Sequence, residues 1–253
     1  MQNYPQQGGS YGQAPPPAKS KTPWIIGGVV GCLFLIVVAL VGLGLIGYLA
    51  SKDGVTSRTS PAPTPSVATT PAPGTTRFVN SREGLTGTLA DNYIDFTFDY
   101  PDTWQRDPEP APSFVRVERT NAAGNTIENF SVGWFSSTGP AAGNTQLLSQ
   151  VVNNLSQQIS GNFPGYTKVS EGPTTLGSYT GHELRFTGAA NKGTRNELPF
   201  WGRVVVLPDP SGSNKGVSVI MLATGHSSEV KSLSDVGTKG ELPVMINSFR
   251  MGK

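Results

Sequence analysis

Apolar residues follow three patterns along the chain, and each pattern predicts a different kind of element. The first pattern is a continuous run from Trp24 to Ala50 that contains no charged residue. At about 1.5 Å per residue a helix of this length reaches roughly 40 Å, more than the roughly 30 Å hydrocarbon core of a bilayer. Trp24 and Tyr48 stand near its two ends, where membrane interfaces favour aromatic side chains. The run therefore predicts a single transmembrane helix over residues 24–50.

A second pattern, alternation of apolar and polar residues, begins after residue 93 and predicts a strand buried on one face. Pro101 has no N–H for a ladder, so pairing should end there, and Trp104 is expected to fold back as an apolar plug at the end of the sheet. On the polar face Asp95 and Asp99 should be solvated and, roughly 13 Å apart, too distant to share one cation. The apolar face consists of Ile94, Phe96, Phe98 and Tyr100.

Further strands are predicted where β-branched and aromatic residues gather between turn residues. The last two of these strands are nearly continuous apolar runs, as expected where both faces of a sheet are covered. Residues 208–216 between them are turn formers and predict a hairpin loop. The predicted strands cover residues 113–119, 126–135, 166–172, 182–188, 200–208 and 216–224.

The third pattern has helical spacing and predicts two helices. Over residues 144–160 the apolar residues share one helix face, Asn144 suits the N-cap, and Gly161 follows the last of them. A shorter pattern over 242–249 has Pro243 in its first turn. Strands and helices together predict an α+β domain over residues 78–253, with helices packed on an antiparallel sheet. The apolar positions of the longer helix are Leu148, Val151, Val152, Leu155 and Ile159.

Two segments without such patterns flank the apolar run. Residues 1–23 are rich in Gln, Gly and Pro, which predicts a disordered tail. Residues 51–77 are rich in Pro, Ser and Thr, which predicts an extended stalk. Basic residues are nearly balanced across the span, so they orient it only weakly. We expect a cytoplasmic tail and an extracytoplasmic domain, because a Ser/Thr/Pro stalk is a common spacer beyond a span.

The charge distribution bears on the class of partner. The chain has 19 basic and 17 acidic residues, of which five basic residues and one acidic residue precede residue 78. The remaining 14 basic and 16 acidic residues give residues 78–253 a slight negative charge. This composition lacks the positive field that phosphate backbones require, and it argues against nucleic acid as a partner.

Other interpretations of the apolar run remain open. A cleavable signal peptide would have a shorter apolar region and would not follow a 23-residue polar tail. The sequence VVGC, ending at Cys32, has the form of a lipobox, but a full apolar stretch continues beyond it. Cys32 is the single cysteine, so no intrachain disulfide can form. Gly27 and Gly31 have the GxxxG spacing of a helix dimer face.

Candidate catalytic and metal-binding residues are few. His182 shares its strand face with apolar residues, which favours a core position over a role as a base or ligand. His226 lies beside Ser227 and Glu229, the residue types of acyl transfer, although no GxSxG elbow accompanies them. A hydrolase that uses His226 is thus an alternative. One cysteine and two histidines argue against a zinc site of the usual kind, and no cofactor is expected.

A contact surface is predicted on the longer helix, because its outward side carries Gln, Asn and Ser but no charge. Two tryptophans on the predicted strands could extend this surface, although core packing is the alternative for both. The predicted contact residues are Ser149, Asn153, Gln157, Trp134 and Trp201.

Three segments stand out as motifs: FTFDYPDTW at residues 96–104, VSEGPTTLGSYTGHELRFT at 169–187 and INSFR at 246–250. Together they resemble the PsbP-like domain family. The resemblance implies an α-β-α sandwich around an antiparallel sheet, and a role in binding or assembly without catalytic residues. The predicted span and stalk depart from the photosynthetic subunit of that family, so a role in oxygen evolution is not implied.

The sequence thus predicts a single-pass membrane protein that displays a non-catalytic PsbP-like binding or assembly domain outside the membrane. Its expected partner is a protein or another envelope component, with an envelope protein favoured. A homodimer through the span is a further expectation. The alternatives are an extracytoplasmic sensor that signals through the span, and the hydrolase that uses His226.

Overall fold

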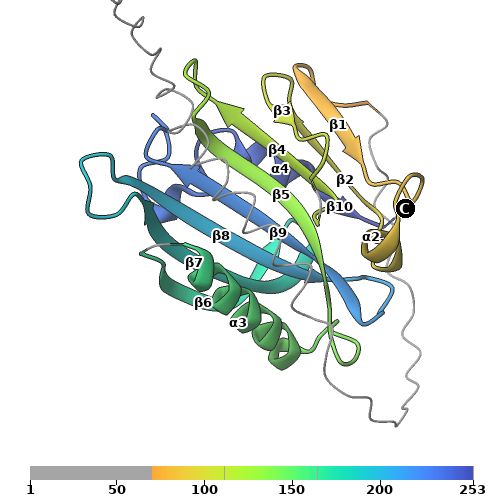
Figure 1. Cartoon of the computed structure of the whole chain (residues 1–253). Coiled ribbons are helices and arrows are strands. Elements are labelled where there is room, and N and C mark those ends of the chain that lie inside the picture. The colour runs from red at the N-terminus through yellow and green to blue at the C-terminus, as the bar shows by residue number, and fades with distance from the viewer. Residues whose placement is uncertain (1–69, 111, 164, 253) are drawn as a thin grey trace, which may run out of the picture.

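The computed structural model describes residues 70–110, 112–163 and 165–252 (Figure 1). The predicted tail and span, most of the predicted stalk, and the residues Gly27, Gly31 and Cys32 lie outside these ranges. Within them, no helix is both long enough and apolar enough to cross a bilayer. The described part is a mixed α/β structure with antiparallel strands, and more of its residues lie in strands than in helices.

Two antiparallel sheets form the framework. The larger has seven strands in the order β3-β4-β5-β9-β8-β7-β6, and the smaller has three in the order β1-β2-β10. The large sheet consists of β3 (Gln105–Arg106), β4 (Val115–Thr120), β5 (Thr126–Ser136), β6 (Thr167–Leu176), β7 (Tyr179–Ala190), β8 (Leu198–Pro208) and β9 (Lys215–Thr224). The small sheet consists of β1 (Thr75–Val79), β2 (Phe96–Pro101) and β10 (Arg250–Met251). The helices are α2 (Gly87–Asp91), α3 (Thr145–Asn162), α4 (Leu242–Ser248) and the 3-10 helix η1 (Leu233–Asp235).

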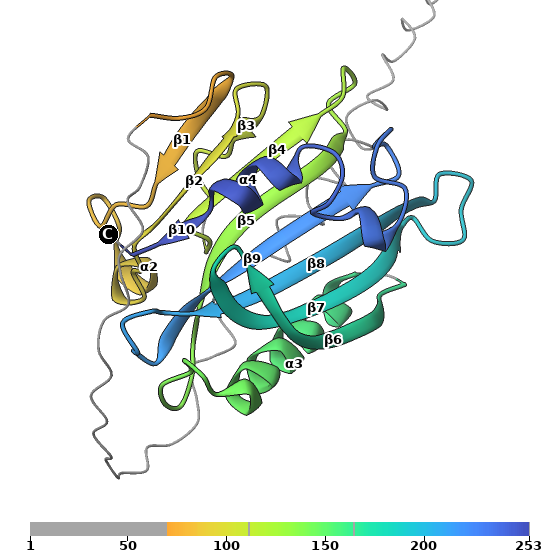
Figure 2. The same cartoon turned by 180° about the vertical axis from the view of Figure 1, so that it is seen from behind.

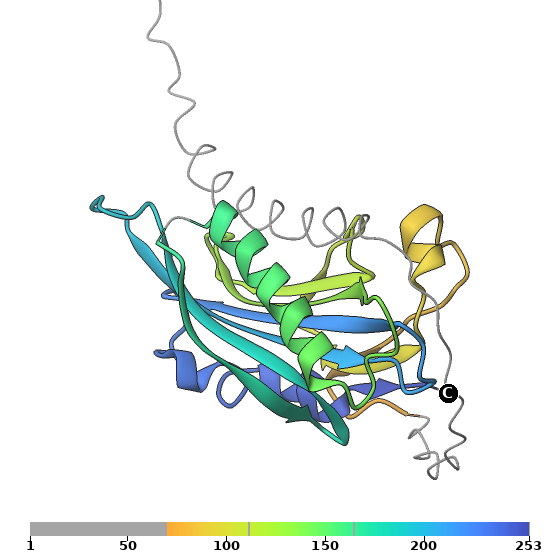
Figure 3. The same ribbon diagram turned by 90° about the horizontal axis from the view of Figure 1, so that it is seen from below.

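Helix α3 covers one face of the large sheet (Figure 3). Its five predicted apolar positions are all buried, and they pack against Leu184, Phe186 and Val204 on the sheet. The side chain of Asn144 accepts a hydrogen bond of 3.1 Å from the backbone N–H of Leu147, so the predicted N-cap is confirmed. The helix continues through Asn162, one residue beyond the glycine expected to follow it.

The opposite face of the large sheet is covered by α4 together with the small sheet (Figure 2). Leu242 and Met245 of α4 are fully buried there, beside the aromatic side chains of β2. Because β8 and β9 lie between two cores, their residues are buried on both faces, as their continuous apolar runs predicted. Trp104 is 4% exposed in the same core, in agreement with the predicted plug.

The small sheet corrects two expectations drawn from the sequence. Strand β1 begins at Thr75, so residues 75–77 of the predicted stalk belong to the folded domain. Asp99 was expected to be solvated, but it is only 6% exposed, because β1 and α4 flank the strand that carries it. Alternation along one strand cannot show that a second element covers the polar face.

Three cross-strand pairs of phenylalanine and glycine close the core under α3. Each ring lies over the glycine directly opposite it in the register: Phe186 over Gly202, Phe200 over Gly188, and Phe135 over Gly216. A Cβ atom at any of the three glycines would lie 2.1 to 2.3 Å from the facing ring. The missing side chains therefore provide the space that the rings fill.

Candidate functional site

The two tryptophans of the predicted contact surface have different environments. Trp134 is 3% exposed and packs in the core beneath α4 and the small sheet. It therefore has the core position that the sequence left open as the alternative to a contact surface. Its indole N–H has no hydrogen-bond partner among the described residues. Trp201 is half-buried and packs against the edge of the same core. Neither indole lies on α3.

The outward residues of α3 are partly engaged within the domain. Ser149 donates a hydrogen bond of 2.6 Å to Glu171 on the neighbouring edge strand β6. The side-chain carbonyl of Asn153 accepts a hydrogen bond of 3.0 Å from Lys168, which also pairs with Glu171. Gln157 is exposed. The structure thus makes Ser149 and Asn153 part of a helix–strand network, although Asn153, like Gln157, is exposed.

The predicted core histidine lies beside this network. His182 is 4% exposed on β7, and its Nε2 atom is 3.3 Å from Glu171. Its Nδ1 atom has no hydrogen-bond partner among the described residues. No group of three or more His, Cys, Asp or Glu side chains in the described ranges is arranged to hold a metal ion.

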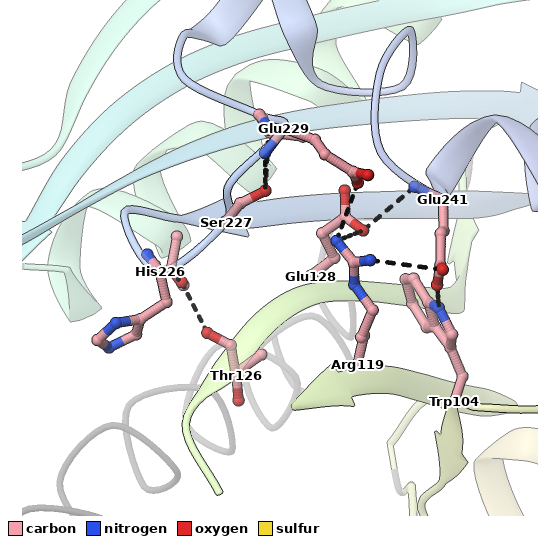
Figure 4. A network of polar contacts seen from close by, with 10 residues as sticks. Trp104, Arg119, Thr126, Glu128, His226, Ser227, Glu229 and Glu241 are labelled. Atoms are coloured by element: carbon pink, nitrogen blue, oxygen red, sulfur yellow. Dashed lines mark hydrogen bonds and ion pairs between the residues drawn. The ribbon is translucent and has the colours of Figure 1, made fainter. Parts of the chain in front are cut away.

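The residues of the alternative hydrolase site do not converge. His226 is exposed, and its imidazole points away from Ser227 and Glu229 (Figure 4). Ser227 is 1% exposed, and its hydroxyl oxygen accepts the backbone N–H of Val230 at 2.9 Å. The carboxylate of Glu229 lies 3.3 Å from the guanidinium of Arg119. Serine and glutamate are therefore engaged in local structure, and the imidazole lies in solvent.

Glu229 belongs to a network in which the guanidinium of Arg119 forms ion pairs with three carboxylates (Figure 4). Arg119 on β4 lies 3.1 Å from Glu128 on β5 and 3.4 Å from Glu241 at the start of α4. Glu241 also accepts a hydrogen bond from the indole N–H of Trp104. The network ties the loop after β9 and the start of α4 to the large sheet.

Glu128 is the buried member of this network. Its side chain is 0% exposed, and its Oε1 atom has no hydrogen-bond partner among the described residues. Burial raises the pKa of Glu128, and the charge of Arg119 offsets this only in part. Gly240 packs closely against the carboxylate of Glu128, since a Cβ atom at this glycine would lie 2.1 Å from Oε1. Because it is fully buried and paired with Arg119, this carboxylate is suited to a structural role more than to ligand binding.

A cavity of about 480 Å³ lies between β1, β2, β10 and α4. Its walls are mainly charged, hydroxyl and amide side chains, so they are more polar than the usual lining of a small-ligand site. The lining residues near the chain's entry into the domain are Thr70, Ala72, Thr75 and Arg77. Those of β2, α4 and β10 are Thr97, Asp99, Val244, Asn247, Ser248 and Arg250.

Strand pairing fixes the charged groups of this cavity. Arg77 lies opposite Asp99 in the register, and the two make a bidentate pair with distances of 2.7 and 2.9 Å. The hydrogen bond to Asp99 raises the pKa of Arg77, so the guanidinium stays charged. Ser248 on α4 holds the backbone of Asp99 in place, because its hydroxyl oxygen accepts a hydrogen bond of 2.8 Å from the backbone N–H of Asp99. This wall of the cavity is therefore fixed before any ligand arrives.

Arg250 forms another wall and lies opposite Thr97 in the register. Its Nη1 atom donates to the backbone carbonyls of Asn247 and Phe249, at 2.9 and 2.7 Å. The sequence analysis missed this site, because its residues come from three segments separated by about 20 and 150 positions. The weak signal that could have indicated it is the basic residue directly after the INSF segment.

A smaller cavity of about 270 Å³ lies where Tyr93 and Asp95 approach the β8–β9 loop. Burial, together with the hydrogen bond to Asp95, raises the pKa of Tyr93 to about 12. This phenol therefore stays protonated at neutral pH, where it acts as a hydrogen-bond donor.

Two of the solved structures that resemble this chain illustrate the likeness. The solution structure of cyanobacterial PsbP from Synechocystis is similar, with a TM-score of 0.41 and 12% sequence identity over 74% of this chain and 98% of that one. The crystal structure of a protein of unknown function from Pseudomonas aeruginosa, described as a putative regulator, has a TM-score of 0.24 and 11% identity over 51% and 77% of the two chains. No family model and no curated protein sequence matches the chain.

Proposed function

We propose that this chain is a single-pass membrane protein whose PsbP-like domain is a non-catalytic binding module held outside the membrane. The cavity between the small sheet and α4 carries the binding role, because its charged walls are fixed by strand pairing and one guanidinium keeps donors available. The membrane anchor rests on the uncharged run over residues 24–50.

The arrangement of potential nucleophiles supports a role without catalysis. A serine nucleophile needs a base within hydrogen-bond reach, and the buried hydroxyl of Ser227 bonds to backbone N–H groups instead. Ser248, the serine of the cavity wall, donates 2.7 Å to the carbonyl of Val244 and accepts from Asp99, so it also serves local structure. Neither Ser227 nor Ser248 is therefore activated as a nucleophile, and the fixed charges of the cavity are suited to recognition of a ligand.

One observation favours the alternative of an extracytoplasmic sensor. Thr70 and Ala72 line the cavity, and they lie at the start of the described domain, on the side that leads to residues 24–50. A ligand in the cavity would contact this segment directly, so occupancy could change its position. If deletion of residues 1–23 leaves every ligand-dependent phenotype unchanged, inward signalling through the tail is wrong.

Site-specific crosslinking in cells tests the binding module. A photoreactive amino acid at Asn247, exposed at the cavity, is compared with one at Gln157 on α3 and one at Lys192 on the β7–β8 loop. We expect specific products from Asn247 that disappear when Arg250 is replaced by Gln. Products specific to Gln157 would instead assign the contact surface to α3. If all three positions capture the same proteins, the proposal of a protein-binding module fails.

A further inference from the structure

The charges around the large cavity select a chemical class of ligand. The lining contains two guanidinium groups and one carboxylate. Asp99 engages Arg77 on both of its oxygens, and the side chains of this pair are 8% and 19% exposed. Their charges cancel, which leaves the single positive charge of Arg250 to set the preference of the site.

Arg250 is positioned to receive an anionic group. Within the described ranges its guanidinium has two acceptors, the carbonyls of Asn247 and Phe249, and both bind Nη1. The donors on Nε and Nη2 thus remain for a ligand, in the forked geometry that matches two oxygen atoms. Thr97 lies beside Arg250 in the register, and its hydroxyl group has no side-chain or backbone partner in the part of the chain that the structure describes.

We propose that this cavity binds a carboxylate group, with Arg250 as its principal partner and Thr97 and Asn247 as neutral hydrogen-bond partners. The proposal rests on the binding role assigned above to the cavity. A carboxylate carries one charge on two oxygens, which matches one guanidinium fork. A phosphate dianion fits less well, because one of its two charges would lack a partner.

The test uses the full-length chain in detergent micelles and follows the side-chain Nε–Hε signal of Arg250 by NMR. The probes are sodium acetate, sodium phosphate, and the peptides acetyl-Gly-Glu-Gly-amide and acetyl-Gly-Gln-Gly-amide, at constant ionic strength set with sodium chloride. We expect a saturable shift with acetate or with the Glu peptide, and none with the Gln peptide. Saturation by acetate alone indicates a small carboxylic acid as ligand, whereas saturation by the Glu peptide alone indicates an acidic side chain of a partner.

Variants separate the site from general effects on the fold. Arg250→Gln should weaken carboxylate binding at least about tenfold, read from peptide Hα shifts, because a charge-assisted fork is lost. Thr97→Val keeps Arg250 and the strand pairing, and it should weaken binding by a smaller factor. Arg195→Gln, on the exposed β7–β8 loop, is the matched control and should leave binding unchanged.

Two results overturn the carboxylate assignment: equal or tighter saturation by phosphate, or saturable shifts of the Glu-peptide Hα signals that persist with the Arg250→Gln variant. The crosslinking experiment and the carboxylate titration can fail independently of each other. Specific crosslinks from Asn247 without any carboxylate response would retain the binding module and reject this ligand class. A carboxylate response without specific crosslinks would support a small-molecule ligand.

Discussion

At the scale of single residues, Glu128 combines a fully buried side chain with incomplete hydrogen bonding. Glu128 faces Arg119, Glu229 and Glu241, and its Oε1 atom is unsatisfied within the described residues. Burial raises the pKa of Glu128, the carboxylates of Glu241 and Glu229 add to this rise, and the charge of Arg119 opposes it. The pH dependence of folding should therefore report on this residue.

We predict that Glu128→Gln removes a pH-dependent loss of stability. Because the folded-state pKa of Glu128 is raised above 4.5, the residue contributes stability that is fully present below pH 4.5 and is lost as pH rises through the folded pKa. The unfolding free energy of the variant, relative to the parent, should thus increase as pH rises above 4.5. Chemical unfolding at several pH values measures this, with Glu109→Gln at an exposed position as control. A difference that is flat with pH would contradict the raised pKa.

Gly240 tests how tightly the same carboxylate is packed. It has a φ of +70°, and a Cβ atom there would lie 2.1 Å from Oε1 of Glu128. Gly212 has a φ of +79° with nothing within 4 Å, so it isolates the backbone effect. Gly212→Ala should cost about 1–2 kcal/mol of unfolding free energy, and Gly240→Ala about 1–3 kcal/mol more. Equal losses in the two variants would show that the loop moves away from Glu128 without cost.

At the scale of elements, the pairs of phenylalanine and glycine fix how β7 packs beside β8, and β5 beside β9, beneath α3. Gly202→Ala would place a methyl group 2.1 Å from the ring of Phe186, which is 1% exposed and has no space to retreat. We expect a loss of about 1–3 kcal/mol in unfolding free energy, measured by chemical denaturation. Gly172→Ala on β6, with nothing within 4 Å, is the matched control and should stay within about 0.5 kcal/mol.

At the scale of the whole molecule, the proposed orientation can be tested on intact cells. With epitope tags at both ends, added protease should remove the C-terminal tag and leave the tail over residues 1–23 protected. Lysed cells provide the control, in which both tags should be lost. Loss of the N-terminal tag alone, with the domain intact, would reverse the orientation.

The elements of the domain could largely be predicted from sequence, but its binding cavity could not. Alternation located β2, helical spacing located α3, and Asn144 marked the start of that helix, because these signals depend on neighbours in the chain. Strand β1 escaped prediction, since it follows a segment rich in Pro, Ser and Thr and is only five residues long. Arg77 and Arg250 became candidates only when strand pairing placed both at one cavity.

The sequence by itself determined the uncharged run over residues 24–50, the order of most strands and helices, and which face of α3 is apolar. These features depend on local periodicity and composition. Only the tertiary structure decided that Asp99 is buried against Arg77, that Trp134 lies in the core, and that Ser227 and Glu229 serve local contacts. Such outcomes depend on which distant segments pack together, because burial and charge pairing are properties of the assembled sheet and helices.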